Sequence, residues 1–368
     1  MTEQTYAPGT YPDLPPPSDT VGPVHWLKAN LFSSPVNSIV TLVAIYLLYL
    51  ALPSAFNWLL IDATYVGETR KDCAPGGACM AFIGERFNLF VYGFYPAELR
   101  WRVNLAAILL VVAGAAVLWD KMPARKHIMK FAMIYPLIGA WLLSGGLFGL
   151  EYVGTHLFGG LMLTLTIGVT GIVFSLPLGI LLALGRQSKL PIIKYFCIGF
   201  IEFIRGVPLI TLLFVASTML SYFLPPGTTF DLLLRVLIMV TLFASAYMAE
   251  VIRGGLQALP KGQLEAANSL GLNYSQAMRL IILPQALKIS IPGIVNTFIG
   301  LYKDSTLVIV IGLLDPLGIG RASVADSAWL GLSTEVYLFV AVFFFISCFG
   351  MARYSLYLEN KLNTGHKR

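Results

Sequence analysis

The sequence predicts an all-α protein whose helices cross a membrane several times. Its residues are 57% hydrophobic and only 12% charged, and the mean hydropathy is +0.75. Apolar runs of about 18 residues or more, the length that crosses a bilayer as a helix, recur along the chain. The short alternating segments typical of spanning strands are not seen. We therefore expect a multi-span helical membrane protein.

The chain begins with a tail of proline and polar residues, 1–23, which has too little apolar surface to fold. The next residues, VHWLKANLF, favour a short helix along the membrane interface, with Trp26 and Lys28 as anchors. We assign residues 1–35 to this tail and interfacial segment, and residues 361–368 to a basic tail at the other terminus.

The apolar runs predict about eight spans. They are 37–60, 103–119, 131–150, 158–185, 195–223, 230–256, 286–313 and 333–357. The first three belong to an N-terminal extension, 36–154, which includes a loop between spans, and the last five fall within 155–360.

The charges of the connections predict the orientation. Basic residues gather in alternate connections, on the side of both termini, and the positive-inside rule makes that side the cytoplasm. They are Lys121, Arg125, Lys126, Lys130, Arg186, Lys189, Lys194, Arg253, Lys261, Arg279, Lys288, Lys361, Lys367 and Arg368. Because these residues are scattered between apolar runs, the net charge of +6 does not indicate nucleic-acid binding.

Two cysteines, Cys73 and Cys79, fall in CAPGGAC on the expected outer side. The intervening Pro-Gly-Gly can turn the chain back, so a disulfide is favoured if that compartment is oxidising. Two unpaired thiols remain the alternative.

A polar stretch, residues 261–285, separates two very apolar spans. If it is helical, Ala267 and Gly271 lie on one face and leave a shallow recess for another protein. Gly271 also suits a helix end, and Pro284 breaks the helix before the next span. The alternative is an ordinary polar loop.

The stretch resembles, position for position, the EAA motif of permease subunits of ABC importers. It reads Glu-Ala-Ala, three residues, Gly, nine residues, Ile, one residue, Leu-Pro. In that family the loop forms a coupling helix that sits in a groove of the ATPase subunit. The resemblance implies that Glu265, Ala266, Ala267 and Gly271 form the docking surface.

Further segments are similar to the polar-amino-acid branch of these permeases. They are GLMLTLTIGVTGIVFSLPLGILLALGR, FIRGVPLITLLF, AYMAEVIRGGLQALPKGQLEAA and KDSTLVIVIG. The resemblance implies a type I ABC importer permease fold with a five-span core at 155–360. The three added spans resemble those of the larger, M-type permeases of general L-amino-acid importers.

The resemblance also implies partners in the bacterial inner membrane. The chain contains no G-x-x-x-x-G-K-[ST] phosphate loop, so ATP and Mg would be bound by two separate ABC ATPase subunits, with no cofactor held by this chain. The implied partners also include a second permease chain, a homologous different one or a copy of this one, and a periplasmic amino-acid-binding protein. The four histidines show no metal-ligand spacing, which argues against a metalloenzyme.

Two segments echo one another, EFIRG at 202–206 and EVIRG at 250–254. In each, Glu precedes Arg by three residues, so Glu202 can pair with Arg205 and Glu250 with Arg253. Both lie near the expected cytoplasmic membrane edge. They serve either to hold helices together or as a gate for a charged substrate.

The seventh span carries Lys303 and Asp304 near its middle, where ionisable groups usually face a cavity or a partner. Asp304, Ser305 and Thr306 favour a helix start, so a break or kink followed by a second half-helix is expected there. Free N–H groups at that break could bind a substrate carboxylate, and Asp304 or Glu250 could accept its ammonium. Pairing of Lys303 and Asp304 with a neighbouring subunit is the alternative.

The aromatic segment 82–96 lies on the outer side, as an interfacial helix or a contact for the binding protein. Two rival functions remain. One is a secondary transporter driven by an ion gradient, which would use its midspan charges without an ATPase. The other is a membrane scaffold with no pathway, for which Asp304 would be dispensable.

Overall fold

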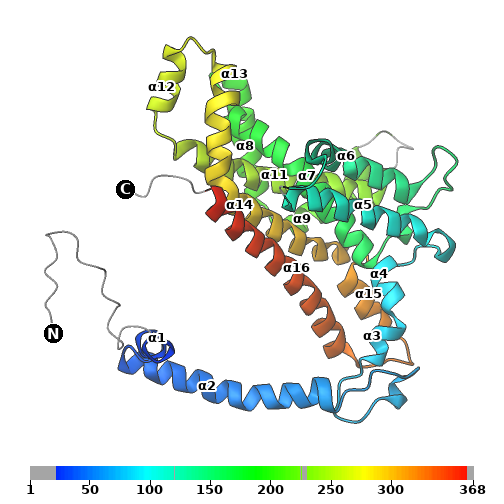
Figure 1. The fold of residues 1–368 in the computed structure, drawn as a ribbon. Coiled ribbons are helices and arrows are strands. Elements are labelled where there is room, and N and C mark those ends of the chain that lie inside the picture. The colour runs from blue at the N-terminus through cyan, green and yellow to red at the C-terminus, as the bar shows by residue number, and fades with distance from the viewer. Residues whose placement is uncertain (1–21, 120, 224, 226–229, 363–368) are drawn as a thin grey trace, which may run out of the picture. The chain divides into compact units, whose positions relative to one another are not determined.

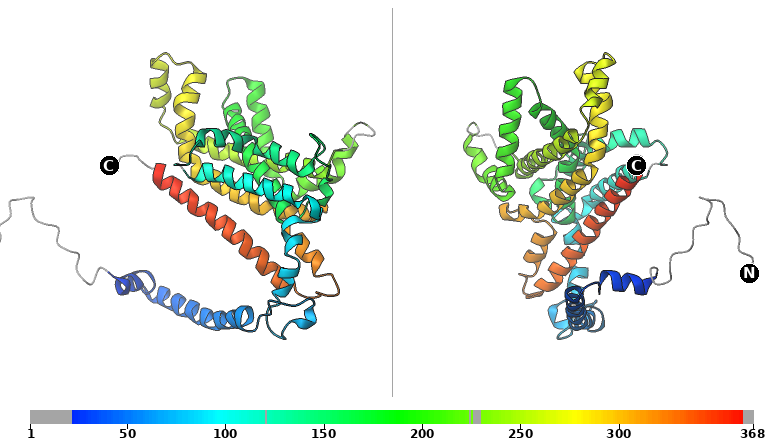
Figure 2. Two further views of the ribbon diagram at one scale, coloured as in Figure 1. Left: turned by 45° about the vertical axis from the view of Figure 1, so that its right-hand side comes forward. Right: turned by 90° about the vertical axis from the view of Figure 1, so that its left-hand side faces the viewer.

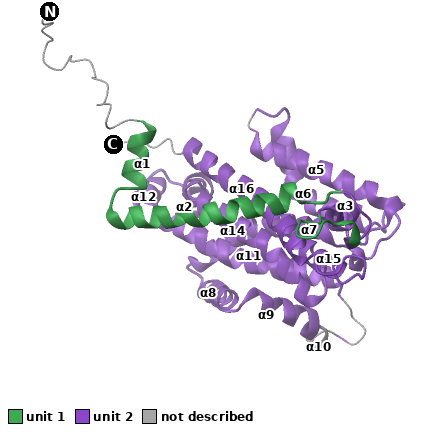
Figure 3. Cartoon of the chain, turned by 90° about the horizontal axis from the view of Figure 1, so that it is seen from below, with its two compact units in different colours: residues 1–65, 71–79 green, residues 66–70, 80–368 purple. Residues whose placement is uncertain are grey.

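The computed structural model describes residues 22–119, 121–223, 225 and 230–362, and it divides the chain into two compact units. Unit 1 comprises residues 1–65 and 71–79, and unit 2 comprises residues 66–70 and 80–368 (Figure 3). The regular structure of the described residues is helical, so the expected all-α, multi-span fold class is confirmed. The tail residues 1–21 and 363–368 lie outside the described residues.

Figure 1 follows the helices along the chain. Their bounds are α1 Pro23–Asn30, α2 Pro35–Phe56, α3 Ala81–Glu85, α4 Phe87–Tyr92, α5 Arg100–Leu118, α6 Arg125–Ser144, α7 Gly160–Arg186, α8 Pro191–Gly206, α9 Leu209–Phe214, α10 Leu220–Phe223, α11 Leu232–Gln257, α12 Gly262–Ser269, α13 Tyr274–Ala277, α14 Leu283–Asp304, α15 Pro316–Ser323 and α16 Ser333–Leu362. Short 3-10 turns lie at Arg70–Asp72, Ala97–Leu99 and Thr155–Leu157, and a longer one at Ser305–Ile311. π-helical turns lie at Asn57–Ile61, Val215–Met219 and Met278–Ile282.

Seven helical segments of the described chain are long and apolar enough to cross a membrane. The expected span at 195–223 is different: α8 and the segment Leu209–Met219 meet at an angle of 101°. Pro208 precedes α9 and has an extended backbone, with φ −59° and ψ 138°, which ends the first helix and starts the second. The total reaches the expected eight only if this bent pair makes one crossing.

Unit 1 contains one long apolar helix, α2, followed by a closed loop. Ser34 caps α2 by accepting a hydrogen bond from the Asn37 N–H at 3.1 Å, and Pro35 fits its first turn. Beyond the helix, Cys73 and Cys79 form a disulfide with Cα atoms 5.5 Å apart. The same loop is closed by the Thr64 N–H, which donates to the carbonyl of Ala78 at 2.8 Å.

The centre of unit 2 is a close pairing of α7, α11 and α14, made possible by glycines. A Cβ on Gly179 of α7 would lie 2.6 Å from the Cβ of Met248 on α11. A Cβ on Gly255 of α11 would lie 2.5 Å from the carbonyl oxygen of Ala286 on α14. Small residues let helix backbones approach inside a membrane, where packing rather than water exclusion holds helices together.

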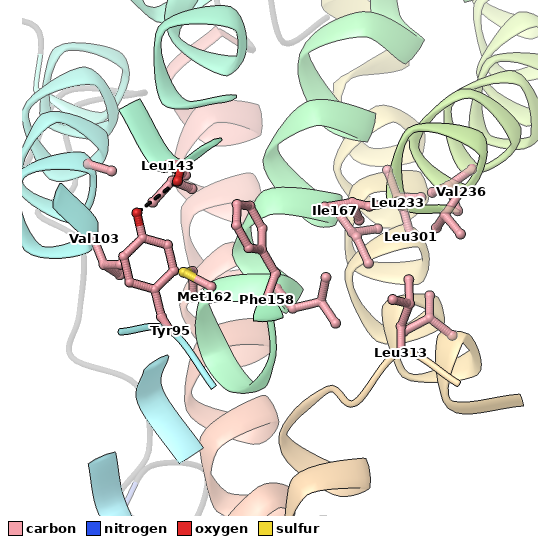
Figure 4. Close-up of a cluster of buried hydrophobic side chains, with 14 of the residues drawn as sticks. Tyr95, Val103, Leu143, Phe158, Met162, Ile167, Leu233, Val236, Leu301 and Leu313 are labelled. Atoms are coloured by element: carbon pink, nitrogen blue, oxygen red, sulfur yellow. Dashed lines mark hydrogen bonds between the residues drawn. The ribbon is translucent and has the colours of Figure 1, made fainter. Parts of the chain in front are cut away.

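Helices α5 and α6 of the N-terminal extension share this core. Tyr95 precedes α5, and its hydroxyl donates to the carbonyl of Leu143 on α6 at 2.7 Å (Figure 4). Tyr135 of α6 donates to the carbonyl of Ala106 on α5 at 2.8 Å. The buried cluster then continues through Phe158 to α7, α11 and α14. The second and third spans therefore pack as part of the same unit as the five-span core.

The aromatic segment 82–96 forms two short helices, α3 and α4, which bury Phe82 and Phe90 and leave Phe87 exposed. Phe82 and Phe90 pack edge-to-face with ring centroids 6.3 Å apart, and Phe82 also packs on the buried Trp329 at 5.5 Å. Arg86 pairs with Asp326, which lies with Trp329 in the loop between α15 and α16. This segment therefore braces that loop, while its expected role as an interfacial helix or a contact for the binding protein stays a prediction.

Replacing Gly255 by Ala should destabilise unit 2, whereas the same change at the neighbouring Gly254 should not. The added methyl group at 255 meets the backbone of α14, and overpacking of this kind costs about 1–3 kcal/mol. A Cβ at 254 meets nothing within 4 Å, and Ala is the better helix former. Thermal unfolding of the purified protein with each single variant checks this. Equal melting temperatures for the two variants would contradict the packing described.

Asp315 is fully buried at the start of α15 and is only half satisfied. One carboxylate oxygen accepts the Gly318 N–H at 2.8 Å, and the other has no hydrogen-bond partner among the described residues. Burial raises the pKa of this carboxyl from 3.8 to about 6, against the lowering effect of backbone N–H groups of Gly318 and Leu317.

The raised pKa predicts a loss of stability as the pH rises from 3.8 to about 6, because the unfolded chain releases the Asp315 proton first. Above that range the penalty is constant. An Asp315→Asn variant keeps the cap acceptor and should abolish this contribution, gaining up to about 3 kcal/mol at pH 7. Melting curves from pH 4 to pH 8 for both proteins test it. Parallel curves would show that the carboxyl is not destabilised by burial.

Candidate functional site

A polar hairpin, residues 262–282, projects from one end of unit 2 in every view (Figures 1 and 2). Its first helix, α12, ends at Ser269 and is followed by Gly271, which has a left-handed backbone with φ of +76°. The Leu272 N–H donates to the carbonyl of Ala267 at 3.2 Å, and the Gly271 N–H donates to that of Asn268 at 2.9 Å. This pair of bonds is a Schellman turn, which satisfies the free carbonyls of the helix end.

The second helix of the hairpin, α13, starts with a capping box. The Asn273 side chain accepts the Gln276 N–H at 2.9 Å, and the Gln276 side chain accepts the Asn273 N–H at 3.0 Å. Hydrogen bonds within the hairpin itself therefore close both the end of α12 and the start of α13.

The residues predicted to dock an ATPase do not all face outward. Glu265 and Ala266 are exposed, and Gly271 lies exposed at the turn. Ala267 is 1% exposed, on the side where α12 packs against α13 and the turn Met278–Ile282. The expected recess between Ala267 and Gly271 is therefore absent, because Ala267 fills the inside of the hairpin. It can affect docking only by holding the two legs together.

The arginine–glutamate cluster lies where α7, α8 and α11 meet. Its centre is Glu250, whose side chain is 16% exposed. One oxygen of Glu250 accepts from Arg186 at 2.7 Å, and the other accepts from Arg253 at 2.8 Å and 3.0 Å. Arg186 also reaches Glu202 at 2.9 Å. One carboxylate therefore joins the end of α7 to α11, and Arg186 extends the link to α8.

The predicted pairing within each Glu-x-x-Arg segment is correct for one segment only. Arg253 pairs with Glu250, but Arg205 approaches Glu250 at 3.7 Å instead of Glu202. Both Glu202 and Arg205 lie near the end of α8, before the bend at Pro208, whereas the sequence placed them at the start of a span. The bend turns the chain away after Arg205, which leaves this arginine beside α11.

A cavity of about 300 Å³ lies between α11 and α14, about one helical turn from the cluster. Its lining residues are Phe243, Ala244, Tyr247, Asn296, Thr297, Gly300, Leu301 and Asp304. Since residue 244 lies at the middle of α11, the cavity is at midspan. Its walls offer aromatic surface, one amide, two hydroxyls (those of Tyr247 and Thr297) and one carboxylate, a set that can hold a small polar molecule.

Of the predicted pathway residues, only Asp304 lines this cavity. Ser305 is buried and its hydroxyl donates to the carbonyl of Tyr302 at 2.7 Å, while Thr306 donates to that of Lys303 at 3.0 Å. Lys303 is exposed and is not among the lining residues. Glu250 belongs to the arginine–glutamate cluster.

The expected break after Asp304 is a change of helix type instead. α14 passes directly into the 3-10 helix Ser305–Ile311, and the Ser305 N–H donates to the carbonyl of Leu301. No half-helix with free N–H groups starts at these residues, so the predicted carboxylate site made of backbone N–H groups is wrong.

Several residues of the site are not predicted from the sequence. The sequence indicates Arg186 only as a basic residue of a connection, but it lies at the end of a span, within reach of both Glu202 and Glu250. Asn296 and Thr297 are adjacent polar residues in an apolar run, a pattern that could have indicated a polar site within the span. Tyr247 lies one helical turn before Glu250, and that spacing could have connected the two features.

Together, the midspan cavity, the charged cluster and the projecting hairpin define a multi-span membrane transport subunit. Residues 175–363 match the sequence model of the family described as "Binding-protein-dependent transport system inner membrane component". The chain is 52% identical over 357 residues, 97% of each chain, to the inner membrane amino-acid ABC transporter permease protein YhdY of Escherichia coli (strain K12).

A second relative is the glutamate/glutamine/aspartate/asparagine transport system permease protein BztC of Rhodobacter capsulatus. It is 47% identical over 421 residues, covering 96% of each chain. A crystal structure of an amino acid ABC transporter with histidines shares 32% identity, with a TM-score of 0.49, over 55% of this chain and 92% of that chain. The chain belongs to the family of binding-protein-dependent ABC permeases. The predicted resemblance to the larger permeases is confirmed, because the first two likenesses include the N-terminal extension.

Replacing Glu250 by Gln should destabilise the protein far more than the same change at Glu202. Removing the Glu250 charge leaves three guanidinium groups without their shared partner, a loss of about 2–4 kcal/mol for a largely buried pair. Glu202 is 54% exposed, and its one ion pair among the described residues is with Arg186, so its loss should cost less than about 1 kcal/mol. Thermal unfolding measures both. A larger loss for Glu202→Gln would contradict the central place given to Glu250.

Proposed function

We propose that this chain is the permease subunit of an amino-acid ABC importer, gripped at its polar hairpin by a separate ATPase. The observation that carries the proposal is the hairpin itself. It holds its shape by its own hydrogen bonds and presents Glu265 and Ala266 outward, while Ala267 packs inside. The proteins named as relatives are amino-acid permeases, which supports the choice of cargo.

The distribution of charge supports an orientation with the hairpin in the cytoplasm. Lys261 and Arg279 lie in or beside the hairpin, and Lys189 lies in the connection between α7 and α8. Under the positive-inside rule both termini are then cytoplasmic, in a bacterial inner membrane. The disulfide-containing loop is then periplasmic, a compartment that favours disulfides.

The proposed complex contains a second permease chain, two ABC ATPase subunits and a periplasmic amino-acid-binding protein. ATP and Mg bind the ATPase subunits, because the sequence of this chain has no phosphate loop. Closure of the ATPases pulls the hairpins together, and the pathway then opens outward. The helical rod Tyr274–Ile311, 38 residues long, supports this coupling because it joins the hairpin to Asp304 without a gap.

The midspan cavity is the proposed substrate pathway. Its volume of about 300 Å³ suits a small metabolite, and Asp304 offers a carboxylate to a substrate ammonium group. An ion-gradient transporter would use the same carboxylate without an ATPase. The family likeness supports the ATP-driven alternative.

Two hairpin variants should weaken docking of the ATPase and so lower both transport and ATP hydrolysis. Glu265→Trp alters the outward surface, and Gly271→Val cannot adopt the left-handed backbone without strain. In proteoliposomes of the full complex, uptake and binding-protein-stimulated ATPase activity should each fall about tenfold or more. Gly271→Asn is the matched control, because Asn tolerates this backbone, and it should retain most activity. Normal coupled uptake by Glu265→Trp and Gly271→Val would refute the docking role.

Asp304→Asn should lower amino-acid uptake by about tenfold or more, since it removes a charged acceptor from the cavity wall. Thr306→Val is the control, because the Thr306 hydroxyl is bonded to its own helix, and it should transport as the unmodified protein does. Uptake by the single chain without any ATPase would instead favour the ion-gradient alternative. Full uptake by Asp304→Asn would favour a scaffold without a pathway.

A further inference from the structure

The arginine–glutamate cluster holds more positive than negative charge. Three guanidinium groups, those of Arg186, Arg205 and Arg253, share the two carboxylates of Glu202 and Glu250. One positive charge is therefore left over. Within a membrane-spanning bundle an excess charge is costly unless it serves a ligand or a partner.

The distances identify Arg205 as the least engaged of the three cations. Arg186 and Arg253 donate to Glu250 at 2.7 Å and 2.8 Å, within normal hydrogen-bond lengths. Arg205 lies 3.7 Å from the Glu250 oxygen that Arg253 already occupies, which is too long for a hydrogen bond. Its guanidinium donates no hydrogen bond to another described residue, and its side chain is 34% exposed.

Tyr247 connects Arg205 to the cavity. The guanidinium carbon of Arg205 lies 5.5 Å from the centroid of the Tyr247 ring, within the range of a cation–π contact. Tyr247 itself lines the cavity together with Asp304. Along α11, Tyr247 is followed by Glu250 in the direction of the hairpin. Arg205 therefore lies beside Tyr247, between the cavity and the end of α11 that leads to the hairpin.

We propose that Arg205 is the carboxylate-binding residue of the pathway and receives the substrate's carboxylate as it passes Tyr247. A planar guanidinium binds a carboxylate through two parallel hydrogen bonds, which the long contact to Glu250 leaves available. The Tyr247 ring and Glu250 hold the guanidinium in place without occupying its donors. The chain thereby selects amino acids over amines of the same size, independently of the binding protein. This inference rests on the proposed function.

The test measures ligand binding to the purified full complex by calorimetry, without the binding protein. The probes are L-glutamine and L-glutamate, each beside its α-methyl ester, which keeps the ammonium group and lacks the α-carboxylate. The unmodified complex should bind at least one amino acid about tenfold more tightly than its ester. Arg205→Gln should lose this preference by weakening amino-acid binding while ester binding changes less than about twofold, and Arg205→Lys should restore part of it.

Lys194→Gln removes a positive charge from an exposed position of the same helix, α8, and should preserve the preference. A merely structural role for Arg205 would weaken amino acid and ester equally in Arg205→Gln. Any of three results would overturn the proposal. They are such equal weakening, an unchanged preference in Arg205→Gln, and no preference in the unmodified complex. Uptake by Asp304→Asn distinguishes failure of this inference from failure of the proposed function. If Asp304→Asn loses uptake while Arg205→Gln keeps its preference for amino acid over ester, the pathway through the cavity stands and only the role of Arg205 fails.

Discussion

The structure depends on one carboxylate in a largely apolar bundle. Glu250 is shared by arginines of three helices, α7, α8 and α11, at the level where the bent pair α8–α9 leaves the core. Glu250 itself is largely buried, and a charge buried in an apolar bundle is stabilised mainly by partners inside the protein. Glu250 therefore fixes how these helices meet between the midspan cavity and the hairpin. The glycines of α7 and α11 then allow the close packing that this meeting requires.

The hairpin and the cavity are connected by continuous helix. The helical segment from Tyr274 to Ile311 is uninterrupted, although its hydrogen bonding changes from α to π and 3-10 types along its length. This helix reaches Asp304, and α14 packs on α11, which carries Tyr247. This connection gives a family of permeases that lack a nucleotide site a physical route by which an outside ATPase could act on the pathway.

The sequence predicted the class of fold, because hydropathy and length specify spans directly. It also predicted the helix end at Gly271, which has a left-handed backbone. The predicted helix break at Pro284 is wrong, because the helix from Tyr274 to Ile311 continues through this residue, which occupies the first turn of α14. The sequence failed where tertiary contacts decide. Arg205 lies beside Glu250 instead of its sequence neighbour Glu202, because the packing of α8 on α11 places it there. The sequence predicted a helix start at Ser305 and Thr306, but in the structure the preceding helix continues through them, which satisfies their N–H groups. The burial of Ala267 could not be predicted from the sequence, because it depends on packing against α13, which no local pattern indicated.

The central claim is that an outside ATPase grips the polar hairpin, and site-specific cross-linking in the native membrane tests it most directly. A photo-reactive residue at Ala266, which is exposed on the hairpin, would be compared with one at Leu330, which is exposed in the loop between α15 and α16. Position 266 should capture an ATPase subunit, identified by mass, and position 330 should not. Capture of that subunit from position 330, or of no nucleotide-hydrolysing protein from position 266, would contradict docking at the hairpin.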